Sequence, residues 1–245
     1  MSRREATIDA AMVREQAAWS SDQSLHFYVT HRCTPEELYE SERFFLPQVL
    51  GKVASVLDVG CAAGGFSAVM KRFNPHLRYV GVDIIPDFIE LARRRYPEAE
   101  FHVADGVSMP FAAESFELVH SSGTLHLNSR YRDMVRTAWD CSSHFLLCDF
   151  RLTRGPSVVG SMAVDFGGPG AVPTHVLPYH VVNVDELLAF LRELRPGPVR
   201  IQGRGYSRPP APSARIPLDK VYMAFFLVEK GRSARPPTVE LTLDE

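Results

Sequence analysis

The chain has 245 residues, 45% of them hydrophobic, which is enough for one α/β domain with additions and a buried core. Its 27 basic and 29 acidic residues give a formal net charge of −2 at pH 7 with no long block of like charge, so nothing indicates a nucleic-acid-binding protein. No run approaches the roughly twenty apolar residues that span a membrane, and the N-terminus lacks the apolar core of a signal peptide.

The first fifty residues contain helix signals. Residues 7–19 place large apolar residues among alanines and charges, which predicts a peripheral helix, whereas residues 20–33 have no clear period. Residues 34–37, TPEE, combine a threonine cap, a proline and a glutamate, and they predict the start of a second helix. We expect Pro47 to kink or end that helix, because proline removes a backbone hydrogen bond.

A glycine-rich turn follows the first predicted strand. The apolar run over residues 53–57 ends at Asp58, residues 60–65 form the turn, and residues 66–71 have the composition of a helix. In a parallel α/β unit such a turn lies at the carboxyl end of the strand, where small residues let a ligand approach and unpaired helix N–H groups face an anion. The stretch therefore predicts a site for a polar small molecule.

Two further strands also end in acids. Residues 77–82 lead to Asp83, where a carboxylate can accept hydrogen bonds from both hydroxyls of a ribose. Residues 101–104 lead to Asp105, and residues 115–123 read as a fourth strand that runs into a small polar loop. This order of strands and acids predicts a nucleoside as the ligand.

Four such units in this order resemble the class I S-adenosylmethionine-dependent methyltransferases. The matching motifs lie at residues 58–64, 81–84, 104–106 and 116–125, and the resemblance covers about residues 45–150. The chain departs from the family at Ala62, where the family usually has glycine.

The resemblance implies a doubly wound, Rossmann-like α/β fold with a seven-stranded mixed sheet over residues 51–230. Residues 1–50 would form an N-terminal helical extension or lid. Residues 152–182 break the regular alternation as an insertion, and their aromatic and histidine content predicts an ordered cover over a pocket. We expect residues 231–245 to be a flexible tail. The remaining predicted elements are helices over residues 130–141 and 183–194 and strands over residues 143–150, 199–202 and 221–228.

S-adenosylmethionine is the cofactor that the resemblance implies. The backbone of the turn, at Gly60, Cys61, Ala62 and Gly64, would lie against the amino-acid end of the cofactor, whose carboxylate is favoured by the helix N-terminus. Asp58 would orient the turn or meet the ammonium group through water.

The strand ends that follow would bind the nucleoside. By the same resemblance, Asp83 would hold the ribose and Ile84 would pack on the adenine face. Asp105 and the backbone of Gly106 would contact the adenine edge, and Ser121 would lie beside the methionine portion.

Methyl transfer needs a base only if the nucleophile carries a proton that must leave, and histidine suits that task near neutral pH. His126 follows the fourth strand, and His175 and His180 lie in the predicted cover, so each is a candidate base, with structural or binding roles as the alternative. Arg151 could pair with an acidic group of the substrate, and Tyr28 in the lid could touch it. Packing or solvated-surface roles are the alternative for both.

The four cysteines, Cys33, Cys61, Cys141 and Cys148, lack paired metal-ligand spacing and are too few for a disulfide scaffold. We therefore expect no bound metal and a reducing, cytoplasmic location.

Three functions fit these observations. The leading interpretation is a methyltransferase acting on an oxygen or nitrogen nucleophile of a small molecule, without nucleic-acid or membrane partners. A nicotinamide-dependent oxidoreductase is disfavoured because Ala62 and Ala63 interrupt the Gly-x-Gly-x-x-Gly pattern. A non-catalytic S-adenosylmethionine-binding protein is the third possibility. The acceptor and the oligomeric state are not identified by the sequence.

Overall fold

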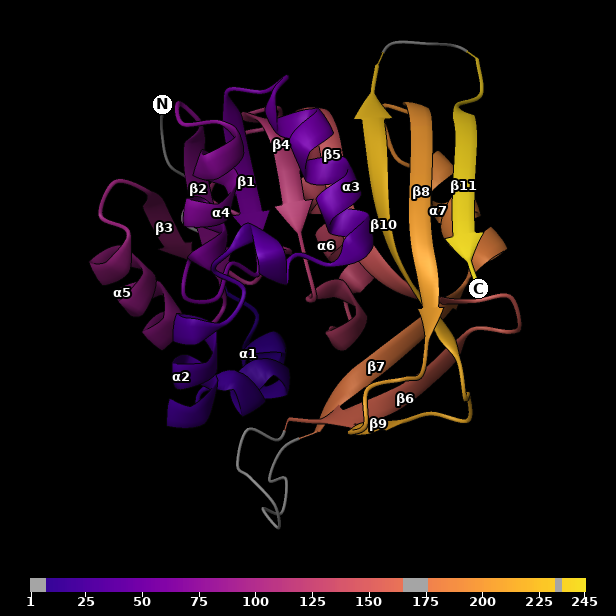
Figure 1. The fold of residues 1–245 in the computed structure, drawn as a ribbon, viewed down its shortest axis with the longest axis horizontal. Helices are drawn as coiled ribbons and strands as arrows, with labels where there is room; N and C mark the ends of the chain where they lie inside the picture. The colour runs from indigo at the N-terminus through magenta and orange to yellow at the C-terminus, as the bar shows by residue number, and fades with distance from the viewer. Residues whose placement is uncertain (1–7, 165–175, 232–234) are drawn as a thin grey trace.

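The computed structural model describes residues 8–164, 176–231 and 235–245. Its main sheet has the strand order β11-β8-β10-β5-β4-β1-β2-β3 (Figure 1). The strands of this path are β1 (Ser55–Val59), β2 (Arg78–Asp83), β3 (Glu100–Val103), β4 (Phe116–Ser121), β5 (Ser142–Thr153), β8 (Pro198–Arg208), β10 (Val221–Lys230) and β11 (Thr238–Asp244). Strands β1 to β5 pair in parallel with one another, whereas β10 is antiparallel to both β5 and β8.

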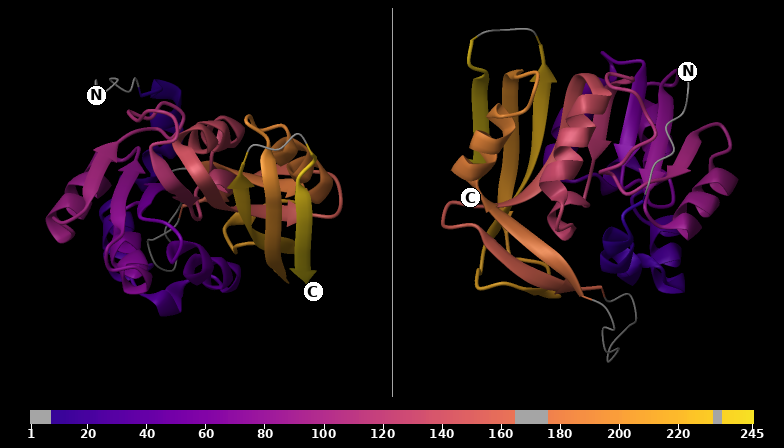
Figure 2. Two further views of the ribbon diagram at one scale, coloured as in Figure 1. Left: turned by 90° about the horizontal axis from the view of Figure 1, so that it is seen from above. Right: turned by 180° about the vertical axis from the view of Figure 1, so that it is seen from behind.

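Helices cover both faces of this sheet (Figure 2). Consecutive strand residues point to opposite faces, so Val56 packs with one set of helices and Leu57 with the other. The first set is α3 (Glu40–Leu50), α4 (Gly65–Phe73) and α5 (Pro86–Arg95), and the second is α6 (Tyr131–Cys141) and α7 (Val184–Arg192). This arrangement confirms the doubly wound α/β fold.

The carboxyl ends of β1 and β4 are covered by two groups of elements that lie far apart in the sequence (Figure 1). One group is N-terminal and consists of α1 (Ala10–Gln16), η1 (Ala17–Trp19), α2 (Asp22–Thr30) and η2 (Pro35–Glu37). The other is a small sheet of β6 (Val158–Ala163), β7 (Val176–Asn183) and β9 (Ala214–Arg215), joined to the main sheet where β7 pairs with the end of β5. The short helix η3 (Leu125–Leu127) lies between β4 and α6 in the chain.

The strand count and the C-terminus differ from the prediction. The structure adds β6, β7, β9 and β11 to the seven expected strands. The prediction of a flexible tail is wrong for Thr238–Asp244, because these residues form β11 and pair in parallel with β8. Val239, Leu241 and Leu243 alternate along β11 and pack against the core. That period of two is a strand signal which the prediction missed.

The N-terminal helices also differ in detail. Residues 20–33, which show no clear period, contain α2, and the Ser21 hydroxyl caps it by accepting a hydrogen bond from the backbone N–H of Ser24. The expected helix from residue 34 is a single 3₁₀ turn, and α3 begins only at Glu40. Pro47 lies inside α3, which continues to Leu50, so the proline does not end that helix. In the described part of the chain, no helix is long and apolar enough to cross a membrane.

Candidate active site

A cavity of about 390 Å³ opens at the carboxyl edge of the sheet, and residues of the N-terminal helices and of the small sheet also line it. Most of the residues that the sequence analysis singled out line it. These are Tyr28, Gly60, Cys61, Ala62, Asp83, Ile84, Asp105, Gly106, His126 and Arg151. The structure therefore brings candidates for cofactor binding and for acceptor binding to one site.

The glycine-rich turn has the tight geometry that a close ligand requires. Gly60 and Gly64 have φ values of 79°, and Ala62 adopts a φ of 45° even though it carries a side chain. A side chain at Gly60 would collide with the side chain of Thr124, and Thr124 lines the same cavity. The backbone N–H groups of Gly60 and Cys61 both donate to the carbonyl of Val82, at 2.8 and 3.0 Å, which fixes the turn on β2.

Asp83 links this turn to the next strand. Its two carboxylate oxygens accept hydrogen bonds from the backbone N–H of Ala62 at 2.9 Å and of Ile85 at 3.0 Å. Each carboxylate oxygen has a second lone pair, so the group can accept further bonds from a diol in the cavity. Burial raises the pKa of Asp83 to about 6, which makes its ionisation sensitive to pH near neutrality.

Asp105 is buried and is held by backbone donors. Its Oδ1 accepts from Val107 N at 3.0 Å and Ser108 N at 2.7 Å, and its Oδ2 accepts from Asp9 N at 2.8 Å. The contact with Asp9 closes the N-terminal segment over the end of β3. Gly106 lines the cavity with a φ of 76°. The sequence offered no signal for Asp9.

Three of the predicted cofactor-binding residues, Asp58, Gly64 and Ser121, do not line the cavity. A side chain at Gly64 would lie only 2.8 Å from the ring of Phe101, so this glycine is required by packing. Ser121 donates to the carbonyl of Val59 at 2.9 Å, and the residues beside it, Ser122 and Gly123, face the cavity instead.

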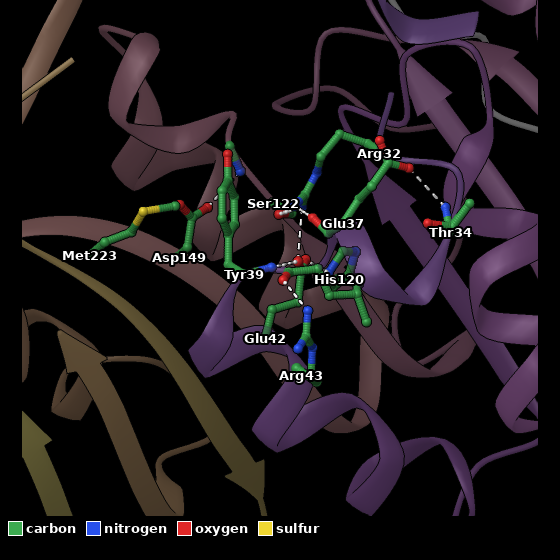
Figure 3. Close-up of polar contacts among 12 residues, drawn as sticks. Arg32, Thr34, Glu37, Tyr39, Glu42, Arg43, His120, Ser122, Asp149 and Met223 are labelled. Carbon is green, nitrogen blue, oxygen red and sulfur yellow. Dashed lines mark hydrogen bonds and ion pairs between the residues drawn. The ribbon is translucent and has the colours of Figure 1, made fainter. Parts of the chain in front are cut away.

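Asp58 belongs to a buried charge network below the turn. It accepts hydrogen bonds from the Tyr79 hydroxyl and from Nδ1 of His120, the latter at 2.8 Å. Nε2 of His120 lies 3.4 Å from Glu42, which in turn accepts a hydrogen bond from Arg32 at 2.8 Å (Figure 3). Burial opposes protonation of His120, but Asp58 and Glu42 raise its pKa to about 9, so it is a cation at neutral pH.

Arg32 connects this network to the cavity. Its guanidinium donates to the Ser122 hydroxyl at 2.8 Å as well as to Glu42, and it stacks over the ring of Tyr39 at 4.0 Å. Arg32 lines the cavity and comes from the N-terminal extension. The network therefore joins the N-terminal cover to the end of β4, and neither Glu42 nor His120 was singled out from the sequence.

His126 has an environment opposite to that of His120. Its side chain is buried, and its Nδ1 has no hydrogen-bond partner among the described residues. The ring packs edge-on against Tyr179 with centroids 5.3 Å apart. Burial, followed by the charge of Arg151, lowers the pKa of His126 well below its usual range. The imidazole is therefore neutral at pH 7, with a free nitrogen in a residue that lines the cavity.

Of the other two predicted histidines, the structure describes His180. It lies on β7 and packs against the ring of Tyr131, 5.1 Å between centroids, but does not line the cavity. Burial lowers its pKa. His175 lies outside the described residues.

Arg151 and Tyr28, for which the sequence analysis predicted contact with the substrate, both line the cavity. Nη1 of Arg151 donates to Asp149 at 2.5 Å, and the other oxygen of Asp149 accepts from the backbone N–H of Gly123 at 2.7 Å. Tyr28 meets Phe88 edge-on at 5.4 Å, and burial raises the pKa of its hydroxyl.

Residues 56–143 match a protein family described as a methyltransferase domain. Two relatives are a demethylmenaquinone methyltransferase of Chlorobaculum parvum, 38% identical over 26% of each chain, and a tRNA (carboxymethyluridine(34)-5-O)-methyltransferase of Saccharomyces cerevisiae, 31% identical over 34% of this chain and 28% of that protein. The chain thus matches about a quarter of the length of these relatives. Among solved structures, the chain is similar to 1,6-didemethyltoxoflavin-N1-methyltransferase of Burkholderia thailandensis. The alignment covers 94% of this chain and 95% of that protein, with a TM-score of 0.59 and 17% identity, which shows a shared fold.

Proposed function

We propose that the chain is a class I S-adenosylmethionine-dependent methyltransferase that transfers a methyl group to an oxygen or nitrogen atom of a small-molecule acceptor. The match of residues 56–143 to a methyltransferase domain and the shared fold support this proposal. The observation that carries this proposal is the shared cavity. Asp83 and Asp105 line it, and so do His126 and Arg151, so the cofactor motif and the candidate acceptor groups share one cavity.

The residues at the strand ends fit S-adenosylmethionine. Asp83 would hold the ribose hydroxyls, Ile84 would pack on the adenine, and Asp105 with the Gly106 backbone would contact the adenine edge. The backbone at Gly60, Cys61 and Ala62 would lie against the amino-acid end. Asp58, Gly64 and Ser121 would not contact the cofactor and would instead hold the turn and the strand ends in place. When bound, the cofactor supplies a methyl group on a sulfonium that is already a good leaving group.

His126 is the residue that we assign as general base. Its neutral imidazole and unpartnered Nδ1 can accept a proton from a hydroxyl or an amine in the cavity. The rest of the protein contributes by holding the acceptor in line and by excluding water, which the N-terminal helices and the small sheet favour. His180 and His175 remain second candidates as parts of the cover.

Two features support a metabolite as acceptor over a nucleic acid. The cavity volume of about 390 Å³ is in the range of small-molecule sites, and the formal charge of the chain is −2. The relative that acts on tRNA makes a nucleic-acid acceptor the alternative to test. Four free thiols, three of them buried, favour a reducing compartment, and we propose the cytoplasm.

Calorimetric titration with S-adenosylmethionine and S-adenosylhomocysteine, with NADH as a control, tests the cofactor. We expect micromolar binding of the first two and none of NADH. Binding of NADH alone would overturn the proposal. Binding of S-adenosylmethionine without formation of S-adenosylhomocysteine in the presence of metabolite extracts or tRNA would favour a non-catalytic binding protein.

Asp83→Ala tests the ribose contact. Loss of charged hydrogen bonds should weaken cofactor binding by about 1.5–3 kcal/mol. The control is Asp87→Ala, which removes an exposed carboxylate from the first turn of α5 and should leave the affinity unchanged. Wild-type affinity in a folded Asp83→Ala variant would reject the assignment.

A further inference from the structure

The charges that line the cavity are divided between its two ends. Within the described lining, the carboxylates are Asp83 and Asp105, both at the cofactor end of the sheet. The cations are Arg32, Arg151 and Arg208. Arg32 donates to Glu42, to the Ser122 hydroxyl and to the carbonyl of Glu37, whereas among the described residues Arg151 has one hydrogen-bond partner and Arg208 has no carboxylate partner, so these two cations have donors to spare.

Arg151 is a buried cation with spare donors. Its side chain is 9% exposed, and among the described residues only Nη1 has a hydrogen-bond partner, Asp149. A guanidinium has five N–H donors in a fixed plane, so the Nε and Nη2 groups are available to a ligand. Gly123 fixes Asp149 from the other side and thereby orients the guanidinium before any ligand binds. Such a preoriented group recognises a carboxylate through two parallel hydrogen bonds.

Arg208 adds a second cation from a neighbouring strand. Met223 on β10 pairs with Arg151 on β5 and with Tyr206 on β8, and Arg208 lies two residues beyond Tyr206. Nη1 of Arg208 contacts the Met223 sulfur at 3.4 Å, which is a weak acceptor and no counterion. Both arginines therefore line the cavity on the same side of the sheet, across β10 from each other.

His126 also lines the cavity, and its ring packs edge-on against Tyr179. Tyr179 belongs to a hydrophobic cluster with Leu127, Met162 and Val221, and all four residues line the cavity as well. These side chains suit the body of an apolar ligand and offer it little hydrogen bonding. Burial of such a body would strengthen its ion pair with Arg151, because charges interact more strongly away from water.

We propose that the acceptor is a small organic acid with an apolar body, whose carboxylate binds Arg151 and Arg208 while its hydroxyl or amine nucleophile hydrogen-bonds to Nδ1 of His126. This proposal rests on the proposed function and names its substrate class. In the transfer, the new bond forms between the methyl carbon and the nucleophile as the carbon–sulfur bond breaks with its electron pair going to sulfur. The proton of the nucleophile passes to His126 and from there to solvent.

Matched ligand sets test the charge preference. Hydroxyphenyl, indolyl and octyl compounds, each as carboxylic acid, primary amide and primary amine, are titrated into protein saturated with S-adenosylhomocysteine. At least one acid should bind tenfold or more tightly than its own amide and amine. No preference for any acid over its amide, including no binding at all, would overturn the proposal.

Variants of the two arginines then test whether these residues cause the preference for acids. Arg151→Gln should reduce the ratio of acid affinity to amide affinity to less than threefold, and Arg208→Gln, at an exposed residue, should reduce this ratio partly. Arg215→Gln is the control, since Arg215 is exposed on β9 and does not line the cavity. Affinity for S-adenosylhomocysteine reports that each variant is folded. A ratio that survives in both Arg151→Gln and Arg208→Gln would also overturn the proposal.

Repeating the acid and amide titrations without S-adenosylhomocysteine separates the two proposals. The arginines are in place without the cofactor, so the acid preference should persist there. Loss of S-adenosylhomocysteine binding alone would reject the proposed function, whereas loss of the acid preference in protein that binds S-adenosylhomocysteine would reject only the substrate class.

Discussion

The two ends of the cavity are built in different ways. At the cofactor end, Asp83 and Asp105 are held by backbone N–H groups of their own or neighbouring turns. At the acceptor end, Arg151 is held by the side chain of Asp149, and Nδ1 of His126 is held by nothing in the described residues. A backbone donor stays in place when the side chains around it change, whereas a side-chain contact is lost when its partner residue is replaced. We therefore expect proteins of this fold that act on different substrates to differ more at the acceptor end than at the cofactor end.

His120 and His126 show the same contrast in one residue type. His120 lies between Asp58 and Glu42 and is charged at neutral pH, while His126 lies near Arg151 and is neutral. Both are buried. Their neighbours, and not their exposure, decide that one stabilises the cofactor end as a cation and that the other is free to take a proton.

The largest effect is expected from breaking the charge network below the cofactor end. Glu42→Gln leaves Arg32 and His120 without their shared carboxylate, and removal of one partner from a buried ion pair destabilises a protein by about 3–5 kcal/mol. Urea denaturation measures this as a lower midpoint. Glu40→Gln, on the exposed side of the same helix, is the control and should change the unfolding free energy by less than about 0.5 kcal/mol. Equal stability of both variants would show that the network contributes no net stability.

A smaller effect, on rate and not on stability, is expected at the acceptor end. His126→Gln removes the proposed base, and a base of this kind contributes at least about 100-fold to the rate of a reaction. Once an acceptor is known, kcat should fall by this factor while calorimetric affinity for S-adenosylhomocysteine stays the same. His144→Gln is the control, because His144 is exposed near the start of β5. If affinity fell together with kcat, His126 would belong to the cofactor end instead.

This difference between the ends explains which parts could be predicted from the sequence. Asp83 and Asp105 follow apolar strands directly, so parallel topology alone brings them to one edge. Glu42 and His120 meet although 78 positions separate their numbers in the chain, and no local pattern signals that contact. Asp9 reaches Asp105 across a separation of 96 residues. The apolar alternation of β11 was present in the sequence, so that strand could have been predicted.

The smallest effect, a dependence of cofactor affinity on pH, tests whether Asp83 acts as a charged acceptor. Burial raises the pKa of this carboxyl to about 6 in the free protein, and ribose hydroxyls favour its ionised form. A proton therefore competes with the ligand: affinity for S-adenosylhomocysteine should be constant above pH 7 and should fall towards tenfold per pH unit below pH 6. Calorimetry between pH 5 and 8 measures the curve, and Asp83→Asn should bind more weakly at pH 8 but without this decline. If the affinity of Asp83→Asn still declined below pH 6, another group would cause the decline, and Asp105 is the next carboxylate in the lining. If the affinity of the wild-type protein did not change with pH, the hydroxyls would bind the neutral and the charged carboxyl equally well.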